Sequence, residues 1–271
     1  MLPHTSAEPG PWRTDRTPYL REIMDALSTG SPYERVVLMK GAQLGATEAA
    51  LSWLAYIACH APGIALLVMP SLDMARRNTR TRIDPMIDST PELKERISAP
   101  RSRDASNSAF SKSFPGGMLV CTGANSAAAL RSTPCRYVAL DELDGFPADV
   151  DQEGDPVSLA IARTVTFRGR RKIFMTSTPT ISGISRIEKA YAEGDMREYR
   201  VPCAVAQPAV PVRARSCRDL CYATDIADSS LGHVFHCRFD VSSTLWRHHS
   251  SPAQFHFARL CLLQIRPTGA Q

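Results

Sequence analysis

The fold is decided by one stretch, Lys40-Gly41-Ala42-Gln43-Leu44-Gly45-Ala46-Thr47, which stands between an aliphatic run at 35–39 and an alanine-rich run at 47–60. The β-branched residues of the first run predict a buried strand, and the second run predicts a helix that Pro62-Gly63 ends. A strand, a glycine-bearing loop and a helix N-terminus in this order direct backbone N–H groups at a phosphate. We therefore predict a phosphate-binding loop at residues 40–47.

The order of residues in this loop differs from the standard pattern G-x-x-x-x-G-K-[ST]. When the two are aligned on Gly45 and Thr47, Ala46 stands in place of the lysine. Lys40 stands in place of the first glycine, and we expect it to reach the β- and γ-phosphates from the opposite end of the loop. The Thr47 hydroxyl is expected to bind Mg²⁺. An ordinary strand–turn–helix unit would give the same pattern, so that alternative stays open here.

A second candidate is the segment 136–142, in which the apolar run 137–140 is followed by Asp141 and Glu142. Ligands of open α/β folds bind at the carboxyl ends of the strands, where these two carboxylates would lie. We expect Asp141 to hold Mg²⁺ through its water shell and Glu142 to orient and deprotonate the attacking water. The alternative is a solvated acidic turn, because Asp144 follows.

A third candidate is the strand predicted at 172–175, which ends in the hydroxyl residues Thr176, Ser177 and Thr178. Hydroxyl groups at that position would sense the γ-phosphate and relay its loss, although a hydroxyl-rich strand cap is the plainer interpretation. The order of the three candidates along the chain adds weight to each of them. Together they predict an enzyme that hydrolyses a nucleoside triphosphate with Mg²⁺.

Predicted strands alternate with predicted helices from about residue 35 to residue 200, which indicates an α/β fold with a mostly parallel sheet and helices on both faces. Helices are expected at 19–27, 47–60, 71–82, 85–97, 156–167 and 185–193, strands at 35–39, 64–69, 137–140 and 172–175, and a hairpin or two neighbouring strands at 110–122. This organisation divides the chain into an irregular lead-in at 1–17, one domain at 18–203 and a tail at 204–271.

The tail differs in composition from the domain, because residues 203–271 contain neither Lys nor Glu. Charged helical surfaces without either residue are unusual in a folded domain. We interpret 204–271 as an irregular segment, either disordered or the product of out-of-frame translation.

The composition of the whole chain excludes several other classes. With 44% hydrophobic and 22% charged residues and a net charge of +5, it is typical of a globular protein with a weak attraction to polyanions. Its apolar runs are far shorter than the roughly 20 residues of a membrane span, and no signal peptide is evident. We expect a protein of the cytoplasm without a membrane partner.

The ordered motifs resemble the ATPase domain of the large terminase subunit of tailed phages, in the lambda-like GpA branch. In that family the phosphate-loop lysine sits early in the loop, as Lys40 does here. The resemblance covers roughly residues 12–203 and rests on the segments 18–23, 41–47, 68–71, 123–126, 130–132, 138–142 and 172–179.

The resemblance implies a fold of the ASCE/RecA-like P-loop NTPase class and a motor that hydrolyses ATP to push double-stranded DNA into a procapsid of the bacterial host. It implies that Lys40 and the 41–47 loop bind phosphates, that Asp141 helps to hold Mg²⁺ and that Glu142 is the catalytic base. Thr176, Ser177 and Thr178 would form the coupling motif. The implied partners are a small terminase subunit, the capsid portal and further copies of the chain in a ring.

Other implied roles are less defined by the residues present. Adenine contacts are expected near Tyr19, with Leu20 or Arg21 where relatives often have Gln. A charge-stabilising arginine is expected, and Arg76, Arg77 and Arg131 are the candidates. Family members continue into a nuclease with clustered carboxylates, whereas the tail offers only Asp219, Asp225, Asp228 and Asp240. We therefore expect no endonuclease activity in this polypeptide. The alternatives are a helicase-like DNA translocase and an inactive prophage remnant.

Overall fold

A computed structural model of the chain describes residues 2, 6, 8–97, 107–197 and 199, together with the backbone of three short strands beyond residue 200. These strands are β8 (Asp219–Tyr222), β9 (His236–Arg238) and β10 (Leu263–Pro267). The tail that we predicted to be irregular thus contributes three short strands. The out-of-frame interpretation of 204–271 concerns mainly residues outside the described part.

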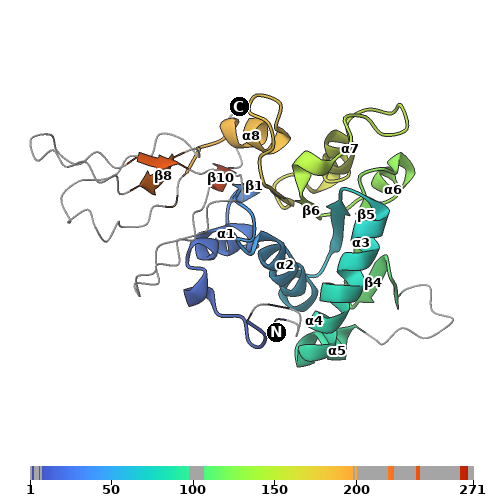
Figure 1. Cartoon of the computed structure of the whole chain (residues 1–271). Helices are drawn as coiled ribbons and strands as arrows, with labels where there is room; N and C mark the ends of the chain where they lie inside the picture. Colours follow the sequence, from blue (N-terminus) through green and yellow to red (C-terminus); the bar gives the residue numbers. More distant parts are fainter. Residues whose placement is uncertain are drawn as a thin grey trace, which may run out of the picture.

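The centre of the molecule is an eight-stranded sheet in the order β10-β1-β7-β6-β2-β5-β4-β3 (Figure 1). Its strands, besides β10, are β1 (Tyr33–Met39), β2 (Ile64–Met69), β3 (Asn107–Ser108), β4 (Ser111–Phe114), β5 (Gly117–Gly123), β6 (Tyr137–Asp141) and β7 (Lys172–Ser177). The five central strands, β1, β7, β6, β2 and β5, are parallel to one another. The strands at the two edges pair antiparallel, β10 with β1 at one edge and β4 with β5 and β3 at the other. The prediction of a mostly parallel α/β sheet is confirmed.

Helices cover both faces of this sheet. They are α1 (Tyr19–Leu27), α2 (Ala46–His60), α3 (Leu72–Asn78), α4 (Asp84–Ser89), α5 (Pro91–Arg96), α6 (Ala127–Arg131), α7 (Pro156–Ala162) and α8 (Arg186–Ala192). Figure 1 shows α2 on one side of the strands and α7 and α8 on the other. Among the described residues, none of the helices combines the length and the apolar character that crossing a bilayer requires.

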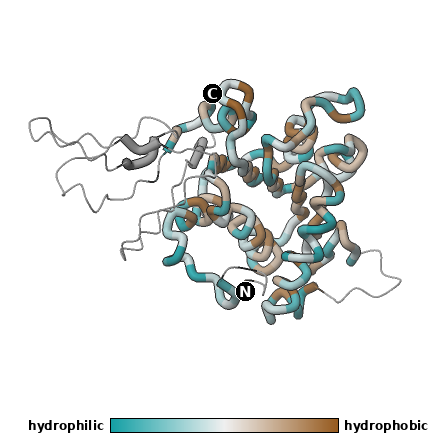
Figure 2. Tube along the Cα trace, viewed as in Figure 1, coloured by the Kyte–Doolittle hydropathy of each residue, from teal (hydrophilic) through white to brown (hydrophobic). Residues whose placement is uncertain are grey.

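Two hydrophobic cores follow from the alternation of side chains along the strands. In β1, Val36 and Leu38 join the core beneath α1 and α2, while Val37 and Met39 join the core beneath α6, α7 and α8. Figure 2 shows the resulting concentration of hydrophobic residues along the central strands. Since both faces are buried, the central parts of the parallel strands are apolar, and polar residues stand at the strand ends.

Several elements differ from their predicted form. The helix expected at 71–82 ends as α3 at Asn78 and continues as a π-helical turn, Thr79–Ile83. The helix expected at 156–167 is α7 followed by the separate 3₁₀ turn Val165–Phe167. The hairpin expected at 110–122, by contrast, is confirmed, with β4 antiparallel to β5.

Candidate active site

The sheet order brings three strand ends together at one edge. Strand β7 lies between β1 and β6, and its Thr176 pairs in register with Leu38 of β1 and with Asp141 of β6. All three strands run parallel, so the residues that follow them meet at the carboxyl edge of the sheet. The candidate residues at the ends of β1, β6 and β7 therefore form one cluster, as the sequence predicts.

Lys40 is the centre of this cluster. It follows β1 directly and is only 5% exposed. Its Nζ donates to Glu142 Oε1 at 2.9 Å and to Thr178 Oγ1 at 3.2 Å, and its backbone N–H donates to Ser177 O at 3.1 Å. The ammonium group thus links the ends of all three strands through side chains that belong to the predicted site.

The loop that follows Lys40 is shaped by backbone conformations that favour glycine. Gly45, the N-cap residue of α2, has φ +76°, and Gln43 also lies in the left-handed region with φ +60°. A Cβ at Gly45 would lie 3.4 Å from the Leu20 side chain of α1, so α1 packs closely against this turn. The loop and the first helix are therefore one packed unit.

The two residues predicted near adenine lie differently on that helix. The buried Tyr19 donates its hydroxyl hydrogen to Leu44 O of the loop at 3.1 Å. The Tyr199 ring meets the Tyr19 ring edge-on at 6.0 Å. Arg21 lies on the exposed side of α1. The structure brings Tyr19 to the loop and leaves Arg21 facing solvent.

Asp141 faces the start of α2. It is 1% exposed, and its Oδ2 accepts a hydrogen bond from Thr47 Oγ1 at 3.0 Å. Its Oδ1 is buried without a hydrogen-bond partner among the described residues. Burial raises the pKa of Asp141 to about 6, and the charge of Glu142 adds to this effect, while Thr47 and Lys40 oppose it. An orphaned, buried carboxylate oxygen beside a hydroxyl oxygen is an arrangement that a hard cation would complete.

Glu142 adopts a left-handed backbone conformation with φ 56° and ψ 53°, which costs a non-glycine residue about 1–2 kcal/mol. The turn is closed by Gly145 N, which donates to Glu142 O at 2.9 Å. The Glu142 side chain is 38% exposed, in contrast to Lys40 and Asp141. Glu142 is thus the solvent-accessible acid of the cluster. Its strained backbone conformation is of the kind that occurs at functional sites.

Only one of the three hydroxyl residues contacts the other site residues through its hydroxyl group. Thr178 Oγ1 accepts from Lys40. Ser177 Oγ instead accepts from Asp144 N at 3.1 Å and donates to Thr178 O at 3.1 Å. Thr176 Oγ1 is buried without a hydrogen-bond partner among the described residues.

The three candidate arginines lie apart from Lys40. Arg131, at the end of α6, forms an ion pair with Glu153. The Arg76 guanidinium lies 5.1 Å from the centroid of the Phe110 ring, and Arg77 is exposed on α3. Within the part of the chain that the structure describes, none of these guanidinium groups bonds to Lys40, Asp141 or Glu142. Among the described residues, the structure therefore does not bring Arg76, Arg77 or Arg131 into contact with the cluster around Lys40.

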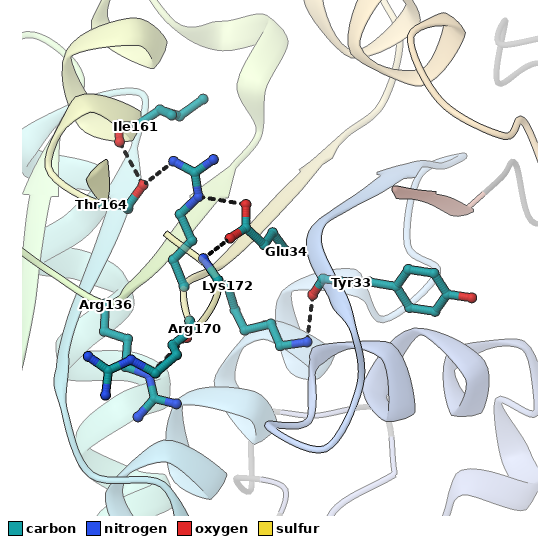
Figure 3. Close-up of polar contacts among 9 residues, drawn as sticks. Tyr33, Glu34, Arg136, Ile161, Thr164, Arg170 and Lys172 are labelled. Atoms are coloured by element: carbon teal, nitrogen blue, oxygen red, sulfur yellow. Dashed lines mark hydrogen bonds and ion pairs between the residues drawn. The ribbon is translucent and has the colours of Figure 1, made fainter. Parts of the chain in front are cut away.

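The opposite edge of the sheet holds a second buried lysine, Lys172 at the start of β7 (Figure 3). Its Nζ donates to three backbone carbonyls, Ala26 O at 3.2 Å, Ser31 O at 2.7 Å and Tyr33 O at 2.5 Å. Burial lowers the pKa of Lys172 to about 8. Beside it, Glu34 accepts from Arg171 Nε at 2.9 Å. No motif of the sequence predicts this network.

Asp144, like Lys172, makes hydrogen bonds that the sequence does not predict. Its carboxylate accepts from the backbone and the hydroxyl of Thr180 and from the backbone of Ile187. The acid itself was noticed, but as a sign of a solvated turn. The one sequence feature that could have indicated a role for Asp144 is its position two residues after Glu142.

The strand order and the position of the cluster are those of the P-loop NTPase fold class. The loop strand β1 and the acidic strand β6 are separated by the strand β7, which is the arrangement of the ASCE class.

Comparison with known proteins narrows this class. Residues 6–225 match the family described as phage terminase large subunit gpA, ATPase domain, and the chain belongs to that family. Over 206 residues the chain is 30% identical to the large terminase subunit of Escherichia phage lambda, and over 203 residues it is 32% identical to that of Enterobacteria phage P21. These alignments cover 74% and 73% of this chain but 31% of each relative, so the chain spans less than a third of their length.

The fold has a counterpart among solved structures. The crystal structure of the HK97 bacteriophage large terminase matches with a TM-score of 0.53 at 12% identity, over 71% of this chain and 38% of that chain. At this identity the match concerns the fold alone, and it agrees with the α/β sheet described above.

Proposed function

We propose that this chain binds ATP at the carboxyl edge of its sheet and hydrolyses it to ADP and phosphate. The observation that carries the proposal is the junction of Lys40 with Glu142 and Thr178, which joins three neighbouring strand ends around one buried ammonium group. The phosphates would lie on the backbone N–H groups of 41–47 at the start of α2, where the helix dipole favours negative charge. Lys40 would donate to the β- and γ-phosphates.

Thr47 and Asp141 would hold the Mg²⁺ of the nucleotide. The fit rests on the orphaned Asp141 Oδ1 and on the Thr47 hydroxyl beside the other carboxylate oxygen. Proteins usually bind Mg²⁺ through one or two carboxylates together with substrate phosphates, which matches a single buried acid. The bound ion supplies neutralisation of the phosphate charge.

Glu142 would act as the base that accepts the proton of the attacking water. Its exposed fraction gives water access, and its Oε1 accepts a hydrogen bond from Lys40 Nζ. A triphosphate would compete with Glu142 for the Lys40 ammonium group, because phosphate oxygens carry more negative charge than one carboxylate. Binding of ATP would thereby free Glu142 to orient the water.

Thr178 would sense the γ-phosphate, since its hydroxyl shares Lys40 with the phosphate site. The arginine that stabilises the transition state would come from a neighbouring copy of the chain. Among the candidates, we favour Arg131 at the end of α6, because its pairing with Glu153 leaves about half of its side chain exposed and is readily exchanged. Arg76 and Arg77 are the alternatives.

In the cell, hydrolysis would drive packaging of double-stranded DNA into a procapsid in the cytoplasm of a bacterial host. The support is membership in the terminase family and the names of the two relatives. The partners proposed are duplex DNA, a small terminase subunit, the capsid portal and a ring of identical subunits. We assign this activity to residues 18–203, with Tyr19 beside the adenine, and propose no endonuclease function for residues 1–271.

The test is ATP turnover by the full chain with and without duplex DNA, beside Glu142→Gln. Loss of a general base lowers turnover by about 10²–10⁴-fold, so we expect a fall on the order of 10³-fold. Glu95→Gln, an exposed acid on α5, is the matched control and should retain wild-type turnover. Equal turnover in the wild type and in Glu142→Gln, or no turnover in the folded wild type, would contradict the proposal.

A further inference from the structure

The carboxylate of Asp144 is the meeting point of one segment of the chain. Its Oδ2 accepts from the backbone N–H of Thr180 at 2.9 Å and from the Thr180 hydroxyl at 3.0 Å. Its Oδ1 accepts from the backbone N–H of Ile187 at 2.9 Å. These donors lie between the end of β7 and the first turn of α8, so one side chain fixes both ends of the segment 180–187.

Asp144 is also two residues from Glu142, the proposed base, in the sequence. It belongs to the short turn 143–145 that follows Glu142, and this turn is closed by the hydrogen bond from Gly145 N to Glu142 O. Because the backbone of Glu142 is held in the left-handed region, its position depends on the contacts that fix the residues after it. Asp144 provides such contacts with its side chain and its backbone.

Hydrogen bonds on Ser177 and Thr178 lie between Asp144 and Lys40. The backbone N–H of Asp144 donates to Ser177 Oγ at 3.1 Å, and Ser177 Oγ donates to Thr178 O at 3.1 Å. Thr178 Oγ1 in turn accepts from Lys40 Nζ. Asp144 therefore links the segment 180–187 to Ser177 and Thr178, the residues beside Lys40.

The acceptor role requires an ionised carboxylate. Burial opposes ionisation, but hydrogen bonds from Ile187, Ser185 and Thr180 outweigh it and lower the pKa of Asp144 below its usual value. Asp144 is thus a fixed anion at neutral pH, able to accept several hydrogen bonds at once.

We propose that Asp144 is a positioning residue for hydrolysis: it acts through Glu142, by fastening the turn that carries the base to the segment 180–187. The inference rests on the proposed ATPase activity and deepens it. It assigns to Asp144 no contact with the nucleotide, so the residue should influence the rate of the chemical step rather than nucleotide binding.

The experiment is steady-state ATP hydrolysis by the full chain carrying Asp144→Asn. The asparagine keeps the shape of the side chain but replaces one acceptor oxygen by an NH₂ group, which cannot accept from Thr180 or Ile187. Small displacements of catalytic groups lower rates by up to about 10²-fold, so we expect kcat to fall at least about tenfold while KM for ATP changes less than about twofold.

Two further variants separate positioning from a general loss of structure. Thr180→Val removes the hydroxyl donor to Asp144 and should lower kcat about threefold, whereas Thr180→Ser keeps that donor and should restore wild-type kcat. Asp149→Asn is the matched control, because Asp149 also binds two backbone N–H groups, those of Gln152 and Gly154, in a neighbouring loop. It should leave kcat unchanged.

The outcomes distinguish the positioning role of Asp144 from the ATPase activity on which it rests. Unchanged kcat in Asp144→Asn beside an inactive Glu142→Gln would overturn the positioning role and leave the ATPase activity standing. The same holds if turnover falls only in proportion to the folded fraction, or through KM with kcat intact. A folded wild type without turnover would overturn both.

Discussion

Two buried lysines on neighbouring parallel strands show how the two edges of the sheet differ. Lys40 follows β1 and Lys172 begins β7, and they are 5% and 4% exposed. Lys40 donates to side chains, a carboxylate and a hydroxyl. Lys172 donates to three backbone carbonyls. The same side chain in similar burial therefore has partners of two different kinds.

The kind of partner decides what each lysine can do. Side-chain partners can rotate away when a stronger anion arrives, so the Lys40 ammonium group is available to a phosphate. Backbone carbonyls of Ala26, Ser31 and Tyr33 are fixed by the fold, and all three donors of Lys172 are used by them. We infer that Lys40 serves the proposed chemistry and that Lys172 joins the end of α1 to β1 and β7.

The largest effect that separates the two edges is expected from Lys40→Met. It removes the donor proposed for the β- and γ-phosphates, and loss of one such donor lowers rates by about 10²–10³-fold. ATP turnover should fall by about 10³-fold, equivalent to about 4 kcal/mol in the barrier, with little change in the unfolding midpoint. Lys94→Met, an exposed lysine of α5, is the control. Turnover within threefold of the wild type in Lys40→Met would break the comparison.

A smaller effect with opposite signs for activity and stability is expected from Asp141→Asn. The pKa of Asp141 is raised to about 6, so the folded chain holds this proton more tightly than the unfolded chain. The contribution of Asp141 to stability therefore falls as pH rises from about 4 to about 6, and the full penalty is present above pH 6. Removing the charge should stabilise the protein at pH 8 by up to about 3 kcal/mol and lower ATP turnover by about 10²-fold.

Thermal unfolding of the wild type and Asp141→Asn at pH 4.5 to 8 measures this. The advantage of the variant should shrink as pH falls below about 6, because Asp141 is then neutral in the wild type as well. Asp88→Asn, on the exposed side of α4, should show no such dependence. A variant less stable than the wild type at pH 8 would show that Asp141 is a structural acid.

The smallest effect is expected from Lys172→Met, which tests the other edge. Three carbonyls lose their donor, at about 1–3 kcal/mol for each that stays buried, and removal of a buried charge offsets part of that loss. The free energy of unfolding should fall by about 2 kcal/mol in denaturant titration, while turnover per folded molecule stays at the wild-type value. A stable variant with impaired turnover would place Lys172 in the mechanism instead.

Most of the fold could be predicted from periodicity and from residues that end elements. The bounds of α1 and β2 agree with the predicted 19–27 and 64–69, since Pro62-Gly63 and Pro70 mark the limits of β2 and helical spacing marks α1. The five-residue helix α6 and the two-residue strand β3 were missed. Elements this short contain too few residues to show a hydrophobic period, and tertiary contacts decide whether they form.

The site could be predicted only in part. Its residues follow strands, which the sequence indicates, but their meeting depends on β7 lying between β1 and β6, which no local pattern specifies. The left-handed backbone of Glu142 has no sequence signal, because glutamate is not a residue that favours this region. Asp144 was missed because its partners Thr180 and Ile187 are 36 and 43 residues away. Lys172 was missed because its partners are backbone carbonyls, which carry no sequence signal.

The most direct test of the contrast between the two lysines is equilibrium binding of a fluorescent, non-hydrolysable ATP analogue with Mg²⁺ to the full chain. Saturable binding is predicted for the wild type, Glu142→Gln and Lys172→Met, and its loss for Lys40→Met. Binding that survives Lys40→Met, or that is lost in folded Lys172→Met, would contradict the assignment of the carboxyl edge of the sheet to the nucleotide.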